Sequence, residues 1–334
     1  MKNKMMSVMI RAAVLGLAMT TAQAAKVEGA PAPACEGLKV ATGPAGKGYS
    51  KLYADIVRIS KNSVPLCEVN TEGGLDNLTT LSIKKADVGI VPLDALKKMA
   101  EGDANIAALL VVASLNSNYL HIVTSANGYT FDGPKKFGVL KGESKTVRIT
   151  KMSELRGAPV ALVGSAQLLV RQLDKALGYN MQYIDVDSDD AAFKKVQSGQ
   201  AYAAFTVAGW PHGQITRLAQ NSGLTLVGFD VPISGPYSVR PFSYKNIGVY
   251  NVQALAVQNV LVTRPFSGSK TGDVAALKQL LERELPELKD GDFEPGWNEI
   301  KSLDAKVDWP GFTGGAPAAV ADDAPAAPVA KKRK

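Results

Sequence analysis

Two glycine-rich segments have the composition and spacing of loops that bind an anion. Residues 43–50 and 71–77 each follow a short apolar segment, and each precedes a stretch with helical character. Glycine lets the backbone approach a ligand closely, and the first turn of a helix offers N–H groups with no partner inside the helix. We therefore predict that both loops contact one small ligand, through Gly46, Lys47, Gly48, Tyr49, Thr71, Gly74 and Asn77.

Each loop also has a purely structural interpretation. Glycines are common in tight strand-to-helix turns that bind nothing, and Thr71, Asp76 and Asn77 are residue types that cap helices. Lys47 would then be a solvated loop lysine, and Tyr49 would pack on the helix that follows. Asp76, which is negative, favours capping over contact with an anion. The first loop is not a P-loop, because the G-x-x-x-x-G-K-[ST] spacing is absent.

A similar arrangement recurs later in the chain. Residues 158–163 read as a strand, and 164–167 open a helix that extends to about residue 177. Another strand at 202–206 is followed by a turn. We predict that these two places supply the other side of the same site, through Gly164, Ser165, Gln167, Thr206, Gly209 and Trp210. The alternatives are an N-cap role for Ser165 and a core position for Trp210.

Residues suited to catalysis or metal binding are sparse. The G-x-S-x-G pattern of a nucleophilic serine is missing, and no base is paired with a nucleophile. His121 lies within an apolar segment and is expected to be a core residue, whereas His212 lies at a helix start. Two isolated histidines do not predict a metal site. We therefore expect a protein that is not an enzyme and that has neither a cofactor nor a metal.

The elements that must position these residues alternate between strand and helix. Such alternation specifies a mainly parallel sheet flanked by helices, and ligands bind such sheets at the carboxyl ends of the strands. We predict an α/β fold with two lobes, lobe I formed by residues 25–122 plus 262–313 and lobe II by 123–261. An amphipathic helix at 273–285 would pack back on lobe I. The chain would then cross between lobes near 121–126 and 256–264, forming a two-strand hinge.

The two ends of the chain differ from its body. Residues 1–24 have the basic start, short apolar core and A-x-A site of a cleaved signal peptide, which predicts a periplasmic protein. Residues 314–334 are an Ala/Pro-rich stretch with a basic end, expected to be a disordered tail. Of the net charge of +7, these two segments carry +5, so the body is nearly neutral and nucleic acid is not an expected partner.

Two further features concern the exported chain. Cys35 and Cys67, the chain's two cysteines, are expected to form a disulfide, the alternative being two buried thiols. Residues 129–152 resemble loops or a small hairpin insertion.

Four segments together resemble the TAXI family of periplasmic solute-binding proteins. They are TGPAGKGY at 42–49, TEGGLDNL at 71–78 with KADVGIV at 85–91, ASLNSNYLHIV at 113–123, and SELRG at 153–157 with its following strand. The first loop departs from the family's G-T-Y-Y ending, and Asp76 replaces its usual glutamate. The resemblance implies a monomeric receptor with a type II periplasmic binding protein fold, which captures a small carboxylate or amino acid and delivers it to a tripartite ATP-independent (TRAP) permease.

Two other functions remain open at this stage. A binding protein for an ATP-driven (ABC) importer would share the same architecture. A scaffold or sensor partner, with its tail attached to cell-surface polyanions, would keep the fold without a transport role.

Overall fold

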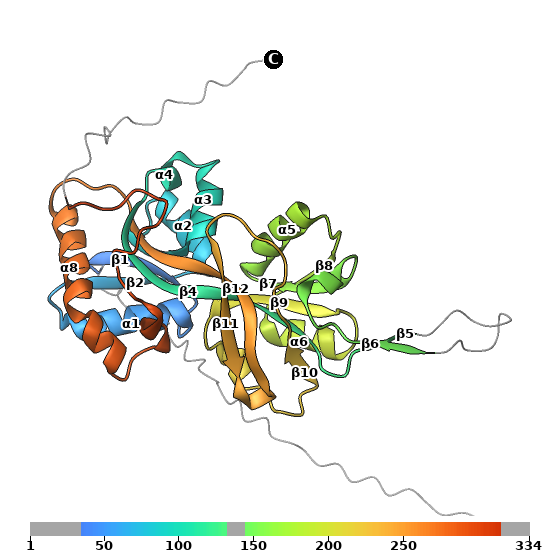
Figure 1. The fold of residues 1–334 in the computed structure, drawn as a ribbon. Coiled ribbons are helices and arrows are strands. Elements are labelled where there is room, and N and C mark those ends of the chain that lie inside the picture. Colours follow the sequence, from blue (N-terminus) through green and yellow to red (C-terminus); the bar gives the residue numbers. More distant parts are fainter. Residues whose placement is uncertain (1–34, 132–143, 315–334) are drawn as a thin grey trace, which may run out of the picture. The chain divides into compact units, whose positions relative to one another are not determined.

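Strands and helices alternate along the chain, as predicted, in a computed structural model that describes residues 35–131 and 144–314. Ten strands form one sheet, with the main order β2-β1-β3-β12-β4-β9-β7-β8. Strand β10 adds to β4, and β11 adds to β12. The described residues from Glu36 onward belong to one compact unit. In Figure 1, one group of helices lies around the left end of the sheet and a second group lies around its right end.

The first half of the sheet is built from the N-terminal strands and is covered in part by the C-terminal helix. Its elements are β1 (Leu38–Gly43), α1 (Gly48–Ser60), β2 (Leu66–Asn70), α2 (Gly74–Ser82), β3 (Val88–Pro92), α3 (Leu93–Ala100), α4 (Ala104–Ala107), the start of β4 (Leu110–Ser125), α8 (Ser269–Asp290) and the 3₁₀ turn η3 (Pro295–Glu299).

The second half takes the central part of the chain. Its elements are the rest of β4, β5 (Tyr129–Phe131), β6 (Lys145–Val147), the 3₁₀ turn η1 (Met152–Leu155), β7 (Pro159–Val163), α5 (Ala166–Leu177), β8 (Gln182–Val186), α6 (Asp189–Gln197), β9 (Ala203–Gly209), α7 (Gly213–Thr216), β10 (Leu224–Leu226), β11 (Tyr237–Tyr244), the 3₁₀ turn η2 (Lys245–Ile247) and the start of β12 (Val249–Thr263).

Two long antiparallel strands join the halves. Strands β2, β1 and β3 are mutually parallel, as are β8, β7 and β9. Between these groups lie β12 and β4, which pair antiparallel with each other and with their neighbours β3 and β9. The predicted α/β class with mainly parallel sub-sheets is thus confirmed, and the chain passes between the halves twice.

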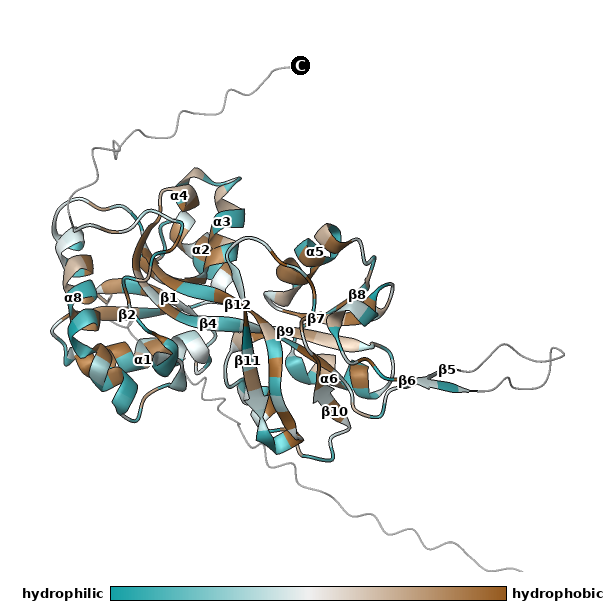
Figure 2. Ribbon diagram, in the orientation of Figure 1, coloured by the Kyte–Doolittle hydropathy of each residue, from teal (hydrophilic) through white to brown (hydrophobic). Residues whose placement is uncertain are grey.

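The hydrophobic interior is divided between the two halves. One pair of clusters packs α1, α8 and α2–α4 on the first half, and another pair packs α5, α6 and β11 on the second. Helix α8 buries Val274, Leu277 and Leu281 beside Leu52 of α1, so the late amphipathic helix packs where the sequence predicted. Figure 2 shows that α1, α5 and α8 each carry both hydrophobic and hydrophilic residues. Each helix buries its apolar side on the sheet.

Several element boundaries differ from the sequence predictions. Strand β4 is one continuous strand, because its apolar residues are buried on both faces, and Ile106 lies before it in α4. Strand β12 begins at Val249 and pairs with β11, which the sequence analysis did not identify as a strand. The helix predicted from His212 is only the short α7. On β4 the change from one core to the other falls between Leu115 and Tyr119.

Other predictions concern the periphery. Cys35 and Cys67 are disulfide-bonded, as predicted. Strands β5 and β6 pair as a hairpin, as expected for the insertion at 129–152. The predicted signal peptide at 1–24 and tail at 314–334 lie outside the described residues, apart from Gly314. None of the helices in the described ranges has the length and apolar content needed to cross a membrane.

Candidate ligand-binding site

The carboxyl ends of the two parallel sub-sheets meet at one place. Pro92, the last residue of β3, pairs with Asn259 of β12, and Gly209, the last residue of β9, pairs with Asn118 of β4. Asn118 and Asn259 are themselves hydrogen-bonded, with 3.0 Å between Oδ1 of Asn118 and Nδ2 of Asn259. The helices that follow the parallel strands therefore begin near this junction, α1 to α3 from one half and α5 to α7 from the other.

The tip of α1 has the open geometry expected of a ligand loop. Lys47 precedes the helix, no side chain caps it, and residues 46–48 are exposed. A Cβ placed on Gly46 or Gly48 would meet no atom within 4 Å, so there is free space at both positions. The N–H of Gly46 donates to the Ser50 hydroxyl and that of Lys47 to the carbonyl of Pro44, so the accessible groups of this tip are the Lys47 side chain and the backbone of Gly48.

The tip of α5 is similarly uncapped. Ser165 precedes this helix and forms no side-chain cap, so the predicted alternative of an N-cap is not realised. Gly164 has φ +52°, in the left-handed region that favours glycine, and a Cβ there would also meet no atom within 4 Å. Ser165 and Gln167 are half-buried. In contrast, α6 is capped by Ser188, whose hydroxyl accepts a hydrogen bond from the N–H of Ala191.

The second glycine loop uses most of its polar groups internally. Asp76 accepts a hydrogen bond from the N–H of Glu72 at 3.1 Å, which agrees with its expected capping role. Asn77 is fully buried, donates to the carbonyl of Ile90 at 2.7 Å and accepts from the Thr71 hydroxyl at 2.5 Å. Both ends of its amide are occupied and none of its surface is exposed, so its predicted ligand contact stays a prediction that this arrangement does not favour. Asn77 positions the loop instead.

Gly74 is also buried, and its role is steric. A Cβ at this position would lie 2.4 Å from Cδ of Pro92, so only glycine lets α2 start against the end of β3. Thr71 is half-buried, and its hydroxyl also accepts from the N–H of Gly73 at 3.2 Å. The second loop is thus built mainly to hold its own shape beside the first.

Tyr49 turns away from the loop toward the junction of the long strands. Its hydroxyl donates to Oδ1 of Asn259 at 2.8 Å and accepts from Nδ2 of Asn118 at 2.7 Å. Burial raises the pKa of the Tyr49 hydroxyl well above its ordinary value, so the group stays protonated. Tyr49 therefore bonds to the crossing strands, and its predicted ligand contact through the hydroxyl is not supported.

An acidic residue and a histidine lie together at the start of α6. Oδ2 of Asp189 is 3.2 Å from Nε2 of His212, and the Thr206 hydroxyl is 3.4 Å from the same nitrogen. Burial alone would raise the pKa of Asp189, but the hydrogen bond and charge of His212, together with Thr206 and Lys47, hold that pKa below its usual value. Lys47 comes from α1 and Asp189 from α6, so opposite charges from the two halves influence each other here.

His121 lies beneath this group. It is fully buried, its Nε2 is 2.8 Å from the Tyr244 hydroxyl, and its ring centroid is 5.4 Å from that of His212. Burial, together with the charge of His212, lowers the pKa of His121 to about 3, so the ring is neutral at neutral pH. The expectation of a core histidine holds, but the two histidines are not isolated from each other. No group of three metal-ligating residues occurs among the residues described.

The contact between Thr206 and His212 superficially resembles a nucleophile with its base. However, Nδ1 of His212 accepts from the N–H of Gln214 at 3.4 Å, so a neutral ring carries its proton on Nε2 and donates it to Asp189. Nε2 then has no lone pair with which to accept a proton from Thr206, in contrast to a catalytic triad. The arrangement fixes Asp189 in its charged form and is not set up for nucleophilic attack.

Trp210 and Gly209 complete the end of β9. The indole N–H of Trp210 donates to the carbonyl of Ser243 at 3.2 Å, and the ring packs on the core of the second half, which fits the structural alternative. Gly209 lies close to the amide of Asn116. These two residues shape the junction without presenting a free polar group to it.

A second carboxylate, also half-buried, lies on the first half of the junction. Asp94, at the start of α3, accepts from the N–H of Ala95 at 2.8 Å and from the Tyr237 hydroxyl at 3.2 Å. Burial raises the pKa of Asp94, although these hydrogen bonds oppose the shift. Tyr237 packs against cores of both halves. Sequence reasoning missed Asp94, although its place just after a buried strand was a usable signal.

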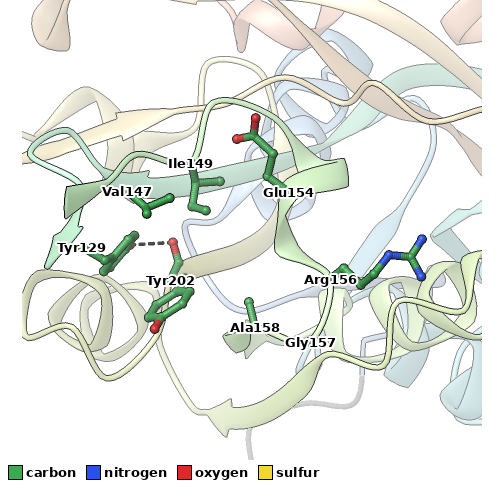
Figure 3. Close-up of a pocket in the computed structure, with 8 residues that line it drawn as sticks. All are labelled: Tyr129, Val147, Ile149, Glu154, Arg156, Gly157, Ala158 and Tyr202. Carbon is green, nitrogen blue, oxygen red and sulfur yellow. Dashed lines mark hydrogen bonds between the residues drawn. The ribbon is translucent and has the colours of Figure 1, made fainter. Parts of the chain in front are cut away.

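A small pocket lies elsewhere, beside the hairpin β5–β6 (Figure 3). Its volume is about 260 Å³, and its lining includes Tyr129, Tyr202, Glu154 and Arg156. Both charged residues have internal partners, since Glu154 accepts from the N–H of Thr150 and Arg156 donates to the carbonyl of Gly178. The pocket is therefore lined by satisfied groups and contains none of the predicted site residues.

Comparison with known proteins agrees with this architecture. The fold is an α/β fold in which two parallel sub-sheets are joined by two antiparallel crossing strands. Residues 40–271 match the NMT1-like family, and the chain belongs to that family. No curated protein matches the sequence.

Several solved structures are similar in fold. An arginine-bound mutant of ArgBP from T. maritima is 15% identical with a TM-score of 0.43, over 74% of this chain and 95% of that one. The amino acid ABC transporter substrate-binding protein AbpA from Streptococcus pneumoniae, bound to L-arginine, is 12% identical with a TM-score of 0.45, over 74% and 89%. The GluR0 ligand-binding core with L-glutamate is 14% identical with a TM-score of 0.46, over 75% and 95%.

Proposed function

We propose that this protein is a periplasmic receptor that captures one small solute between the two halves of its sheet and does not transform it. The observation that carries the proposal is the meeting of Pro92 and Gly209, the ends of β3 and β9, at two residues of the crossing strands whose side chains are hydrogen-bonded to each other. Uncapped helix starts from opposite halves thereby border one junction. Such starts favour an anionic group through their N–H donors and dipole.

The charges around the junction favour a solute that carries both signs. Lys47 and the tips of α1 and α5 suit a carboxylate. The Asp189 carboxylate, held ionised by His212, suits an ammonium group. An α-amino acid presents both groups on one carbon. This refines the sequence expectation of a carboxylate or amino acid toward the zwitterion, and closure would follow from the solute's higher affinity for the closed form.

The proposed partner is the membrane permease of a tripartite ATP-independent transporter, supported by the TAXI resemblance of the loops. The alternative is an ABC importer with the same architecture. The two are separated by which permease, reconstituted in liposomes, accumulates solute when this protein is added.

The test of capture is a thermal-shift screen of L-amino acids and dicarboxylates, with native mass spectrometry of the purified protein. A solute at about 100 times its dissociation constant should stabilise the protein by roughly 2.7 kcal/mol. Lys47→Gln should weaken binding of the best solute, whereas the matched variant Lys51→Gln should not, since Lys51 lies one turn further along α1 and pairs with Glu294. Absence of any stabilising solute, or equal losses in both variants, would count against the proposal.

A further inference from the structure

The two long strands become polar over the same short stretch. Strand β4 has Asn116, Ser117 and Asn118 between apolar residues, and β12 has Gln258 and Asn259. Asn116, Ser117, Asn118 and Asn259 are all at most 8% exposed. On β4, Leu115 and Tyr119 on either side of the stretch belong to the cores of different halves, whereas on β12 Val257 and Val260 both belong to a core of the first half. On β4, polar side chains thus replace hydrophobic packing where one core gives way to the other.

The pairing of the strands is irregular at this same point. The register between β12 and β4 shifts between Gln258 and Val260, where two residues of β4, Leu115 and Asn116, form a bulge opposite Asn259. A bulge locally disrupts the ladder and bends the strand. Nearby, the N–H of Ser117 donates to Glu299 of η3 at 3.3 Å. The pairing between β12 and β4 is therefore interrupted here, as it is again between Leu261 and Val262.

Three side chains form a closed ring of hydrogen bonds around the bulge. Nδ2 of Asn118 donates to the Tyr49 hydroxyl at 2.7 Å, which donates to Oδ1 of Asn259 at 2.8 Å. Nδ2 of Asn259 then donates to Oδ1 of Asn118 at 3.0 Å. The ring joins both crossing strands to α1, and Tyr49 directly follows Gly48 at the exposed tip of that helix.

We propose that Tyr49 is a positioning residue that couples the α1 tip to the bulge opposite Asn259, so that displacement of the tip and bending between the halves occur together. The inference rests on the proposed function only in treating this bending as a step of solute capture. A solute bound by Lys47 and the α1 tip acts on the crossing strands through a rigid ring and one helical turn. Tyr49 then governs closure without touching the solute.

The test measures the distance between the halves without any solute. Spin labels are introduced as unnatural amino acids at Lys85 and Lys175, which are exposed and lie near the ends of α2 and α5, so the disulfide is left intact. Tyr49→Phe removes two hydrogen bonds and should change the ratio of open to closed arrangements of the two halves roughly tenfold. The distribution of distances between the two labels should then be broader and have a displaced maximum. The matched control Tyr53→Phe, in the same helix with its hydroxyl near Glu68 of β2, should match the wild type.

Asn118→Ala breaks the ring from the strand side and serves if Tyr49→Phe folds poorly. Distributions for both ring variants that superimpose on the wild type, or an equal change in Tyr53→Phe, would overturn the inference. Because the measurement contains no solute, failure to find a ligand leaves its result intact. Unchanged distances between the labels, in turn, would contradict only the role of Tyr49 and would not contradict the proposal that the protein captures a solute.

Discussion

Nε2 of His212 lies 3.2 Å from Oδ2 of Asp189, a hydrogen bond that joins the start of α7 to the start of α6. It keeps a negative charge at the end of β8, where the N–H groups of α6 already have Ser188 as their cap. The second half of the junction therefore combines an uncapped helix at α5 with a fixed carboxylate at α6.

The fixed carboxylate should determine the affinity for an ammonium group. Asp189→Asn removes the charge while keeping the shape, and a hydrogen bond to a charged group contributes about 1.5–3 kcal/mol, so affinity should fall roughly 10- to 100-fold. Isothermal titration with the best solute measures this loss. Asp190→Asn, at the exposed neighbouring position, is the control and should bind as the wild type does. Equal affinity of wild type and Asp189→Asn would show that the carboxylate does not contact the solute.

His121 should make the protein less stable in mild acid. Its pKa is about 3 in the folded protein, against 6.5 when exposed, so the unfolded state binds the extra proton between these values. The free energy of unfolding should therefore fall as pH drops below 6.5, by a few kcal/mol on the order of the pKa difference. Urea unfolding between pH 7.5 and about 4 measures the slope. His121→Gln should give a flatter curve, and identical slopes would contradict the assignment.

Asn77 should matter for folding more than for binding. Asn77→Ala leaves the carbonyl of Ile90 and the Thr71 hydroxyl without their buried partner, which should cost about 1–3 kcal/mol of stability. The dissociation constant of the folded fraction should stay unchanged, because the side chain has no exposed surface. Chemical denaturation and titration of the same sample separate the two effects. If Asn77→Ala instead lost much of its affinity and kept its full stability, Asn77 would contact the solute directly.

Reduction of the disulfide between Cys35 and Cys67 should lower stability. In the chain-entropy model, closing a loop of this length contributes about 4 kcal/mol. Thermal unfolding with and without dithiothreitol measures the change. The double variant Cys35→Ser with Cys67→Ser should start from the lower value and show no response to reductant. The prediction would be contradicted if dithiothreitol did not lower the thermal stability of the wild type either.

The alternation of strands and helices was enough to predict the α/β class and the helix tips at the site. Glycines at the ends of strands are a local signal, and the turn after β1 and the turn after β7 follow directly from it. The hydrogen-bond partners of individual side chains could not be predicted in the same way. Tyr49 and Asn77 lie in the expected loops, but their partners come from β4, β12 and β3.

The group of Asp189, His121 and His212 could not be assembled from the sequence, because β9 and α6 bring together residues that lie far apart in the chain. The position of the polar junction was, however, readable in part. Asn116, Ser117 and Asn118 interrupt an otherwise apolar stretch, and Gln258 and Asn259 do the same in β12. Such paired interruptions in two long buried strands mark where one core ends, which hydrophobic periodicity alone does not reveal.

Strand β12 lies between β3 and β4, so the sheet of the first half is incomplete until residues 249–263 have been translated. Its pairing with β3 joins residues 88–92 to residues 259–263, and contacts of such high sequence separation slow folding. The newly made chain must therefore stay without its central strand, and open to chaperones, until residues 249–263 have been synthesised.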